Sequence, residues 1–130
     1  MSFCFCLLKV IFLRRTMKGG LDIKCLSDIE CVKTSHGCGA KRILISKDDT
    51  DSGITQIAVT HMMAGECVGE HTHNTMEEMF LILEGSVSVM SDGTETVCGK
   101  DDFIHINAGT PHALMVVCDT TFLTIGCAVK

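Results

Sequence analysis

Short segments rich in aliphatic and β-branched residues follow one another through most of the chain, and turn residues separate them. None of them shows the 3.6-residue apolar period of a long amphipathic helix. The clearest turn is "SDGT" (91–94), because an Asp-Gly pair tolerates the positive φ of a tight hairpin. Closely spaced strands with turns between them predict an all-β fold, an antiparallel sandwich or barrel with little helix. We expect strands at 41–46, 54–63, 70–73, 77–84, 86–91, 94–98, 102–106, 112–118 and 120–127.

One of these segments, 78–84, is apolar on both faces. Alternate residues of a strand share a face, so Phe80 and Ile82 lie on one side and Met79 and Leu81 on the other. A strand with one solvated face would alternate apolar and polar residues. We therefore expect the outer face to be covered by the N-terminal strands or by a second subunit, and a homodimer is the predicted assembly.

The first sixteen residues, "MSFCFCLLKVIFLRRT", differ from the rest in composition. Their apolar run is too short to span a bilayer, and its charges follow it, unlike those of a signal peptide. We expect residues 1–16 to be a dispensable N-terminal extension, with a membrane-binding or partner-binding peptide as the alternative. Residues 17–130 are expected to form a single domain with its barrel core at about 53–127.

The charge distribution limits the class of ligand. The net charge of −5 argues against nucleic acid, because phosphate binding needs clustered Lys and Arg. From residue 48 onward Lys100 and Lys130 are the only basic residues, against 13 carboxylates. An anionic ligand would therefore depend on a cation from the N-terminal third, where Lys41 and Arg42 are candidates. The guanidinium of Arg42 is the better bidentate partner for an anion.

The nine cysteines include no C-x-x-C pair. We expect them to be reduced and mostly buried as small apolar residues, in a protein of the reducing cytoplasm.

The stretch "GEHTHNTMEEMFLILEG" (69–85) carries the strongest indication of chemistry. His71 and His73 stand two residues apart, so in a strand both imidazoles point the same way. Two imidazoles on one face can share a divalent metal ion when a carboxylate from a neighbouring strand joins them. Either Glu77 or Glu78 could supply that carboxylate, since strand parity does not choose between two apolar faces.

The wider spacing resembles the first motif of the cupin superfamily. From Gly65 to Gly85 the chain reads G-x5-H-x-H-x4-E-x6-G, which agrees at every defined position and selects Glu78. A further histidine, His112, follows a Gly-Thr-Pro turn. The resemblance implies a small jelly-roll barrel that holds a metal ion. Its implied ligands are His71, His73, Glu78 and His112, and the metal could be Mn, Fe, Ni, Zn or Cu.

The second cupin motif, G-x5-P-x-G-x2-H-x3-N, is kept only in part. Gly109 and His112 match it, while Asp101, Asn107 and Val116 replace its first Gly, its Pro and its Asn. The metal-ligand position, His112, is kept although these other positions differ. The resemblance therefore supports the fold more firmly than any particular activity.

Three histidines remain outside these motifs. His105 precedes the Gly-Thr-Pro turn and is, with Arg42, a weak candidate for substrate binding. His36, in a glycine-containing loop, and His61 are expected to be structural.

Two classes of function follow from the resemblance. The first is a metalloenzyme that acts on a small molecule, as an isomerase or dioxygenase of cupin type. Among small single-domain cupins the chain looks like those described as mannose-6-phosphate isomerase-like, although a sugar phosphate would need more cations than the barrel half offers. The second is a non-catalytic module that binds a metal ion and a sugar or other small metabolite. The sequence assigns no catalytic residue, and neither class calls for nucleic acid or a membrane.

Overall fold

The computed structural model describes residues 20–130, and the expected extension at 1–16 lies outside them. The chain divides after Glu30 into two compact units. In the described part of the first unit, a short 3-10 helix, η1, spans Leu26–Asp28. None of the described helices has the length and apolar character needed to cross a membrane.

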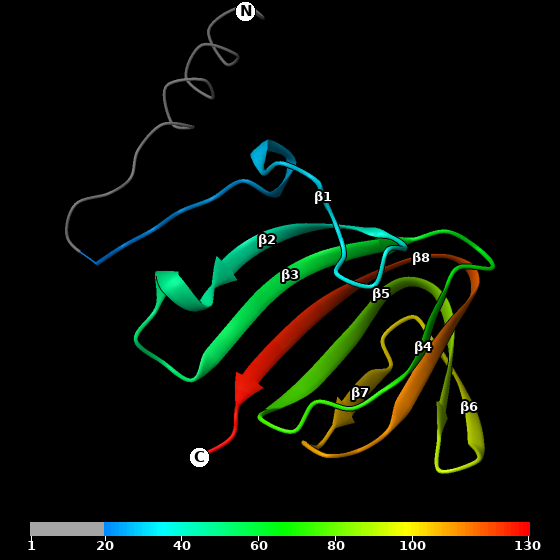
Figure 1. Cartoon of the computed structure of the whole chain (residues 1–130). Helices are drawn as coiled ribbons and strands as arrows, with labels where there is room; N and C mark the ends of the chain where they lie inside the picture. Colours follow the sequence, from blue (N-terminus) through cyan, green and yellow to red (C-terminus); the bar gives the residue numbers. More distant parts are fainter. Residues whose placement is uncertain (1–19) are drawn as a thin grey trace, which may run out of the picture. The chain divides into compact units, whose positions relative to one another are not determined.

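All described strands belong to the second unit, Cys31–Lys130, and every strand pair is antiparallel (Figure 1). The order is β1-β2-β3-β8-β5-β6, with β4 paired to β8 and β7 paired to β5. A second 3-10 helix, η2 (Lys47–Asp49), follows β2. The strands are β1 (Val32–Lys33), β2 (Ala40–Ser46), β3 (Ile54–Met62), β4 (Cys67–His71), β5 (Met76–Ser91), β6 (Thr94–Gly99), β7 (Phe103–Ile106) and β8 (His112–Ala128).

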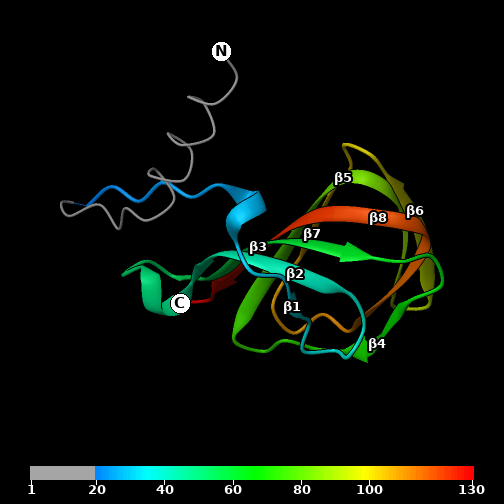
Figure 2. The same cartoon turned by 90° about the horizontal axis from the view of Figure 1, so that it is seen from above.

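This architecture confirms the all-β antiparallel prediction and corrects one part of it. Within residues 20–130 the pairing does not close into a continuous barrel, because β4, β6 and β7 each pair with a single neighbour. The fold is an open sandwich in which β5 and β8 bend and contribute to both layers. Figure 2 shows these two strands running together.

The prediction of a break at Gly85, and of another between 118 and 120, was wrong. β5 and β8 are continuous, and the irregularity is a series of register shifts between Ile82 and Val87. Gly85 has φ +94°, a conformation that L side chains rarely adopt. Beside it the Ser86 amide donates to Thr120 Oγ1 over 3.0 Å. The glycine therefore marks a bend within one strand, since a bulge alters strand direction without ending the pairing.

The core lies between the two layers of the sandwich. Phe80 and Phe122 meet edge to face there, with ring centroids 5.4 Å apart. Ile82 is almost wholly buried, so the expected inner face of this strand is the apolar interior. On the other face Leu83 is 36% exposed and Phe103 of β7 is 59% exposed. The buried apolar cluster comprises Met62, Val68, Phe80, Ile82, Val87, Ile106, Leu114, Val116 and Phe122.

The predicted hairpin at 91–94 is confirmed. Ser91 pairs with Thr94 across the β5–β6 turn. Asp92 and Gly93 both have positive φ, 51° and 70°, as a two-residue hairpin turn with right-handed strand twist requires.

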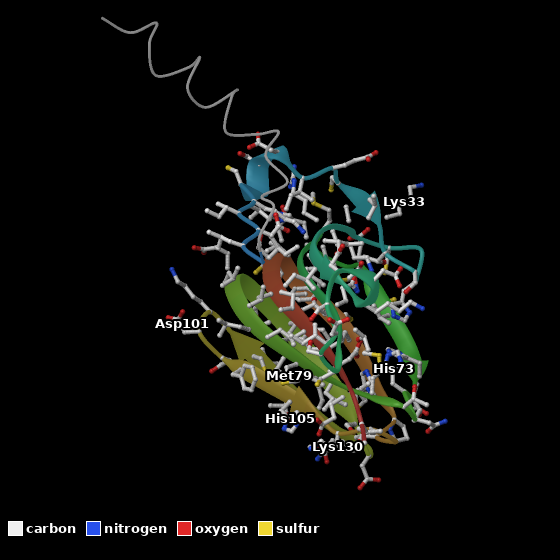
Figure 3. The ribbon with its side chains drawn as sticks, turned by 90° about the vertical axis from the view of Figure 1, so that its left-hand side faces the viewer. Lys33, His73, Met79, Asp101, His105 and Lys130 are labelled. Carbon is white, nitrogen blue, oxygen red and sulfur yellow. The ribbon has the colours of Figure 1, made fainter. Side chains whose placement is uncertain are left out.

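A second aspartate with positive φ, Asp101, stands where the cupin motif has glycine. Its φ is 71°, and it lies in the turn between β6 and β7 (Figure 3). A left-handed conformation costs an L-residue roughly 1–2 kcal/mol, although aspartate tolerates it better than most. The backbone thus keeps the geometry that a glycine would adopt without strain.

We expect Asp101→Gly to raise the free energy of unfolding by about 0.5 kcal/mol, because relief of strain outweighs the added freedom of the unfolded chain. Urea denaturation measures this difference. Asp48→Gly is the matched control, since Asp48 in η2 has no positive φ and the substitution there should lower stability. A loss of stability in Asp101→Gly would contradict the strain assigned to this turn.

The cysteines correct another expectation. The seven described cysteines are free, but none is fully buried. Cys25 and Cys31, which precede the strands in the chain, are exposed. The Cys38 thiol donates to the Cys67 carbonyl oxygen over 3.0 Å. Burial raises the pKa of Cys38, with a further contribution from Glu66, so this thiol is protonated.

Candidate metal-binding site

Three strands bring three histidines and one glutamate together. His71 ends β4 and pairs with His112, the first residue of β8. Glu78 lies in β5, and His73 follows the end of β4. The possible ligand atoms of these four residues all lie within 4.8 Å of one another. Residues far apart in the sequence therefore present four donor atoms to one point.

Backbone carbonyls orient two of the imidazoles. His71 Nδ1 donates to the Gly69 carbonyl oxygen, and His112 Nδ1 donates to the Thr110 carbonyl oxygen, each over 2.8 Å. A carbonyl oxygen only accepts, so each ring carries its proton on Nδ1 when neutral. The Nε2 lone pairs of both rings remain available. Metal-binding histidines are commonly oriented by a hydrogen bond of this kind.

The remaining contacts bring the Nε2 atoms of two imidazoles to the two carboxylate oxygens of Glu78. His112 Nε2 is 3.2 Å from Glu78 Oε2, and His73 Nε2 is 3.4 Å from Glu78 Oε1. Within the described residues His73 Nε2 is buried and has no hydrogen-bond partner. His112 itself is only 1% exposed. A neutral imidazole nitrogen and a carboxylate oxygen gain nothing from facing each other unless a proton or a cation lies between them. The donor set, three imidazoles and one carboxylate, suits a divalent transition metal.

A cavity of about 290 Å³ opens beside this cluster. His73 and Glu78 form part of its wall, so a molecule in the cavity would lie next to the four donor atoms. Its size is near the lower end of small-molecule sites, which are roughly 300–1,000 Å³. The other lining residues are Thr34, Ser35, His36, Lys41, Thr55, Gln56, Thr60, Met76 and Thr124.

His36, which the sequence predicts to be structural, lies beside the histidine cluster. Its ring centroid lies 4.7 Å from that of His71, and it lines the cavity. Burial lowers the pKa of His36, and the neighbouring His71 imidazole lowers it further, so the ring is neutral at pH 7. The loop between β1 and β2 brings it to the site. No spacing rule links positions 36 and 71, and sequence reasoning had no signal for this contact.

The two weak substrate-binding candidates lie outside the cavity wall. Arg42 follows Lys41 in β2, and adjacent residues of a strand face opposite sides. Lys41 lines the cavity and Arg42 does not. His105 pairs with Met79 across β7 and β5, and its Nε2 is 3.2 Å from Glu77 Oε1. Figure 3 shows His105 and Met79 close together and away from His73.

Comparison with known proteins points to one family. The family model described as "Cupin domain" matches residues 58–124, more than half of the 130 residues. Over 72 residues the chain is 29% identical to quercetin 2,3-dioxygenase of Bacillus subtilis (strain 168). That match covers 55% of this chain but 21% of the dioxygenase, so the chain spans only about a fifth of this relative.

Solved structures share the fold at low sequence identity. A predicted oxalate decarboxylase from Thermotoga maritima has a TM-score of 0.73 at 21% identity, covering 83% of this chain and all of that one. Ectoine synthase from P. lautus has a TM-score of 0.71 at 15% identity, covering 82% and 78% of the two chains. The Cnp3 cupin domain of Schizosaccharomyces pombe has a TM-score of 0.69 at 14% identity, covering 82% and 74%.

Proposed function

Because the chain belongs to the cupin family, we propose that it binds a divalent transition metal ion and a small metabolite beside that ion. The metal ligands are His71, His73, Glu78 and His112. The observation that carries this proposal is the convergence of four possible ligand atoms within 4.8 Å of one another, together with the buried Nε2 of His73, which has no hydrogen-bond partner among the described residues. A metal ion at this point would be bound by one ligand atom from each of the four residues.

The protein's own groups prepare the site for this role. The Gly69 and Thr110 carbonyl oxygens hold the rings of His71 and His112 so that Nε2 faces inward. The buried position of His112 excludes water from one side, and the cavity leaves the other side open to a ligand. A bound divalent ion would supply Lewis-acid polarisation of a ligand oxygen.

Three activities could use this metal site. The relation to quercetin 2,3-dioxygenase favours oxygen chemistry on a small organic substrate, with oxygen uptake as its assay. An activity of the mannose-6-phosphate isomerase type would need a phosphate site, yet Lys41 is the one lysine or arginine among the cavity-lining residues. A non-catalytic metal- and sugar-binding module needs the same four ligands and no turnover. Protein that binds metal but shows neither oxygen uptake nor sugar-phosphate isomerisation would favour the non-catalytic binding module.

Two further properties belong to the proposal. The homodimer expected from the apolar outer face remains a prediction, consistent with the exposed Phe103 on that face. A cytoplasmic location also remains a prediction, based on the free cysteines of the described chain.

Metal removal is expected to lower the melting temperature. Purified protein should carry about one transition-metal ion per chain, and EDTA should destabilise it, because an ion bound only by the folded state stabilises that state. Metal content should also fall between pH 7 and pH 5, since protons compete for imidazole nitrogens. Elemental analysis after dialysis at each pH measures the loss. Protein without stoichiometric metal, and with a melting temperature insensitive to EDTA, would contradict the proposal.

A further inference from the structure

Lys41 places a positive charge in the wall of the cavity. It lies in β2 opposite Thr60 of β3, and both residues line the cavity. Within residues 20–130 Lys41 forms no ion pair with a carboxylate. No carboxylate of the described residues thus contacts the ammonium group directly. A cation placed in this way attracts an anionic group of a ligand.

The charge of the whole site strengthens this preference. Glu78 is the one carboxylate among the lining residues. With neutral imidazoles, a divalent ion and this carboxylate together carry one net positive charge, and Lys41 adds a second. Without the ion, Glu78 and Lys41 cancel. The site therefore favours an anion when metal is bound and loses that preference when metal is absent.

Uncharged groups in the same wall are suited to hydroxyls. Gln56 Oε1 is buried and has no hydrogen-bond partner among the described residues, so it requires a donor. The hydroxyls of Thr60 and Thr124 lie 3.2 Å apart, and whichever one accepts keeps its own hydrogen for a further acceptor. A ligand hydroxyl can donate to the glutamine, and the threonine pair can donate to a further ligand oxygen.

From these groups we infer that the cavity binds a small hydroxycarboxylate, with its carboxylate paired to Lys41 and a hydroxyl hydrogen-bonded to Gln56. This inference rests on the proposed function for the metal ion beside the ligand. It adds the chemical class of the ligand and the residues that select it. Neither Lys41 nor Gln56 belongs to the metal-ligand set.

Two pairs of probes test the inference by titration calorimetry on metal-loaded protein. Racemic glycerate is compared with glycerol, and D-gluconate with D-glucitol, so that each pair differs by a carboxylate. At least one acid should bind at least tenfold more tightly than its alcohol, because its carboxylate would form a charge-assisted contact with Lys41 that the alcohol lacks. Lys41→Met should reduce this preference at least severalfold, because only the net charge of the metal ion and Glu78 then remains, and Lys41→Arg should restore part of it. Gln56→Leu should weaken the binding of the acid and the binding of the alcohol by similar factors.

Lys47→Met is the matched control, since Lys47 is exposed in η2 and does not line the cavity. Metal content and melting temperature are measured for each variant, so that folding defects are recognised. Equal binding of acid and alcohol in both pairs, or an acid preference unchanged by Lys41→Met, would overturn the inference while leaving metal binding intact. Loss of the proposed function has a different signature: no stoichiometric metal in the unmodified protein.

Discussion

Glu78→Ala is expected to lose its metal ion, and Glu77→Ala is expected to keep it. The two glutamates are adjacent in β5, so their side chains point to opposite faces. Glu78 is within 3.4 Å of the Nε2 atoms of both His73 and His112. Removing it leaves three imidazoles without the carboxylate that neutralises part of the metal charge. Metal content should fall from about one ion per chain to less than roughly a tenth of that value.

Glu77 makes a different contact. Its carboxylate is 3.2 Å from His105 Nε2, on the face that carries Met79. Both side chains of this pair are partly exposed, and such pairs contribute little, roughly 0–1 kcal/mol. Glu77→Ala should therefore change stability slightly and leave metal content unchanged. Elemental analysis of both variants, purified in parallel, measures the difference. Equal metal in both, or loss only in Glu77→Ala, would overturn the assignment of Glu78.

Gly85→Ala is expected to lower the free energy of unfolding by about 3 kcal/mol or more. A Cβ at Gly85 would overlap the Asp119 carbonyl oxygen and the Thr120 hydroxyl, and it would stand 2.7 Å from Thr120 Cα. The φ of +94° adds backbone strain to this overlap. Thr120 cannot move aside easily, because it is buried and its hydroxyl donates to the Cys118 carbonyl oxygen over 2.7 Å. The bend of β5 against β8 would be distorted.

Two other glycines distinguish the effect of steric overlap from that of backbone strain. Gly93 has φ +70°, but no atom lies within 4 Å of the position that a Cβ would take there, so Gly93→Ala should cost only backbone strain, about 1 kcal/mol. Gly69 has neither positive φ nor a close neighbour, and Gly69→Ala should be nearly neutral. Chemical denaturation of the three variants gives the order. A Gly85→Ala protein as stable as Gly69→Ala would contradict the close packing of β5 against β8.

Local patterns in the sequence predict the strands well because their causes are local. The β-branched runs, the Asp92-Gly93 turn and the alternation that buries Phe80 and Ile82 depend on neighbouring residues. The sequence also marks Gly85 as special, but it predicts a break there instead of a bend. Whether a glycine ends a strand or bends it depends on the partner strand, here Thr120 in β8. That information is not present in the neighbouring sequence.

The residues of the candidate site fall into two groups: those that local spacing predicts and those that strand pairing brings to the cavity. His71, His73 and Glu78 lie within eight residues, and their spacing singles them out. His36 and Lys41 reach the cavity through the pairing of β2 with β3 and through the loop before β2. The choice between Lys41 and Arg42 depends on which side of β2 faces inward, and the better hydrogen-bonding side chain lies outside the cavity wall. Long-range pairing, rather than residue chemistry, decides these positions.

We propose that His71, His73, Glu78 and His112 together hold one divalent transition metal ion. The most direct test is a crystal structure of the purified protein with diffraction recorded above and below the absorption edge of the metal found by elemental analysis. We expect a single anomalous peak at coordination distance from Nε2 of each histidine and from a Glu78 carboxylate oxygen, about 2.0–2.2 Å if the metal is zinc. The absence of a peak at this cluster, or a metal ion bound by other residues, would contradict it.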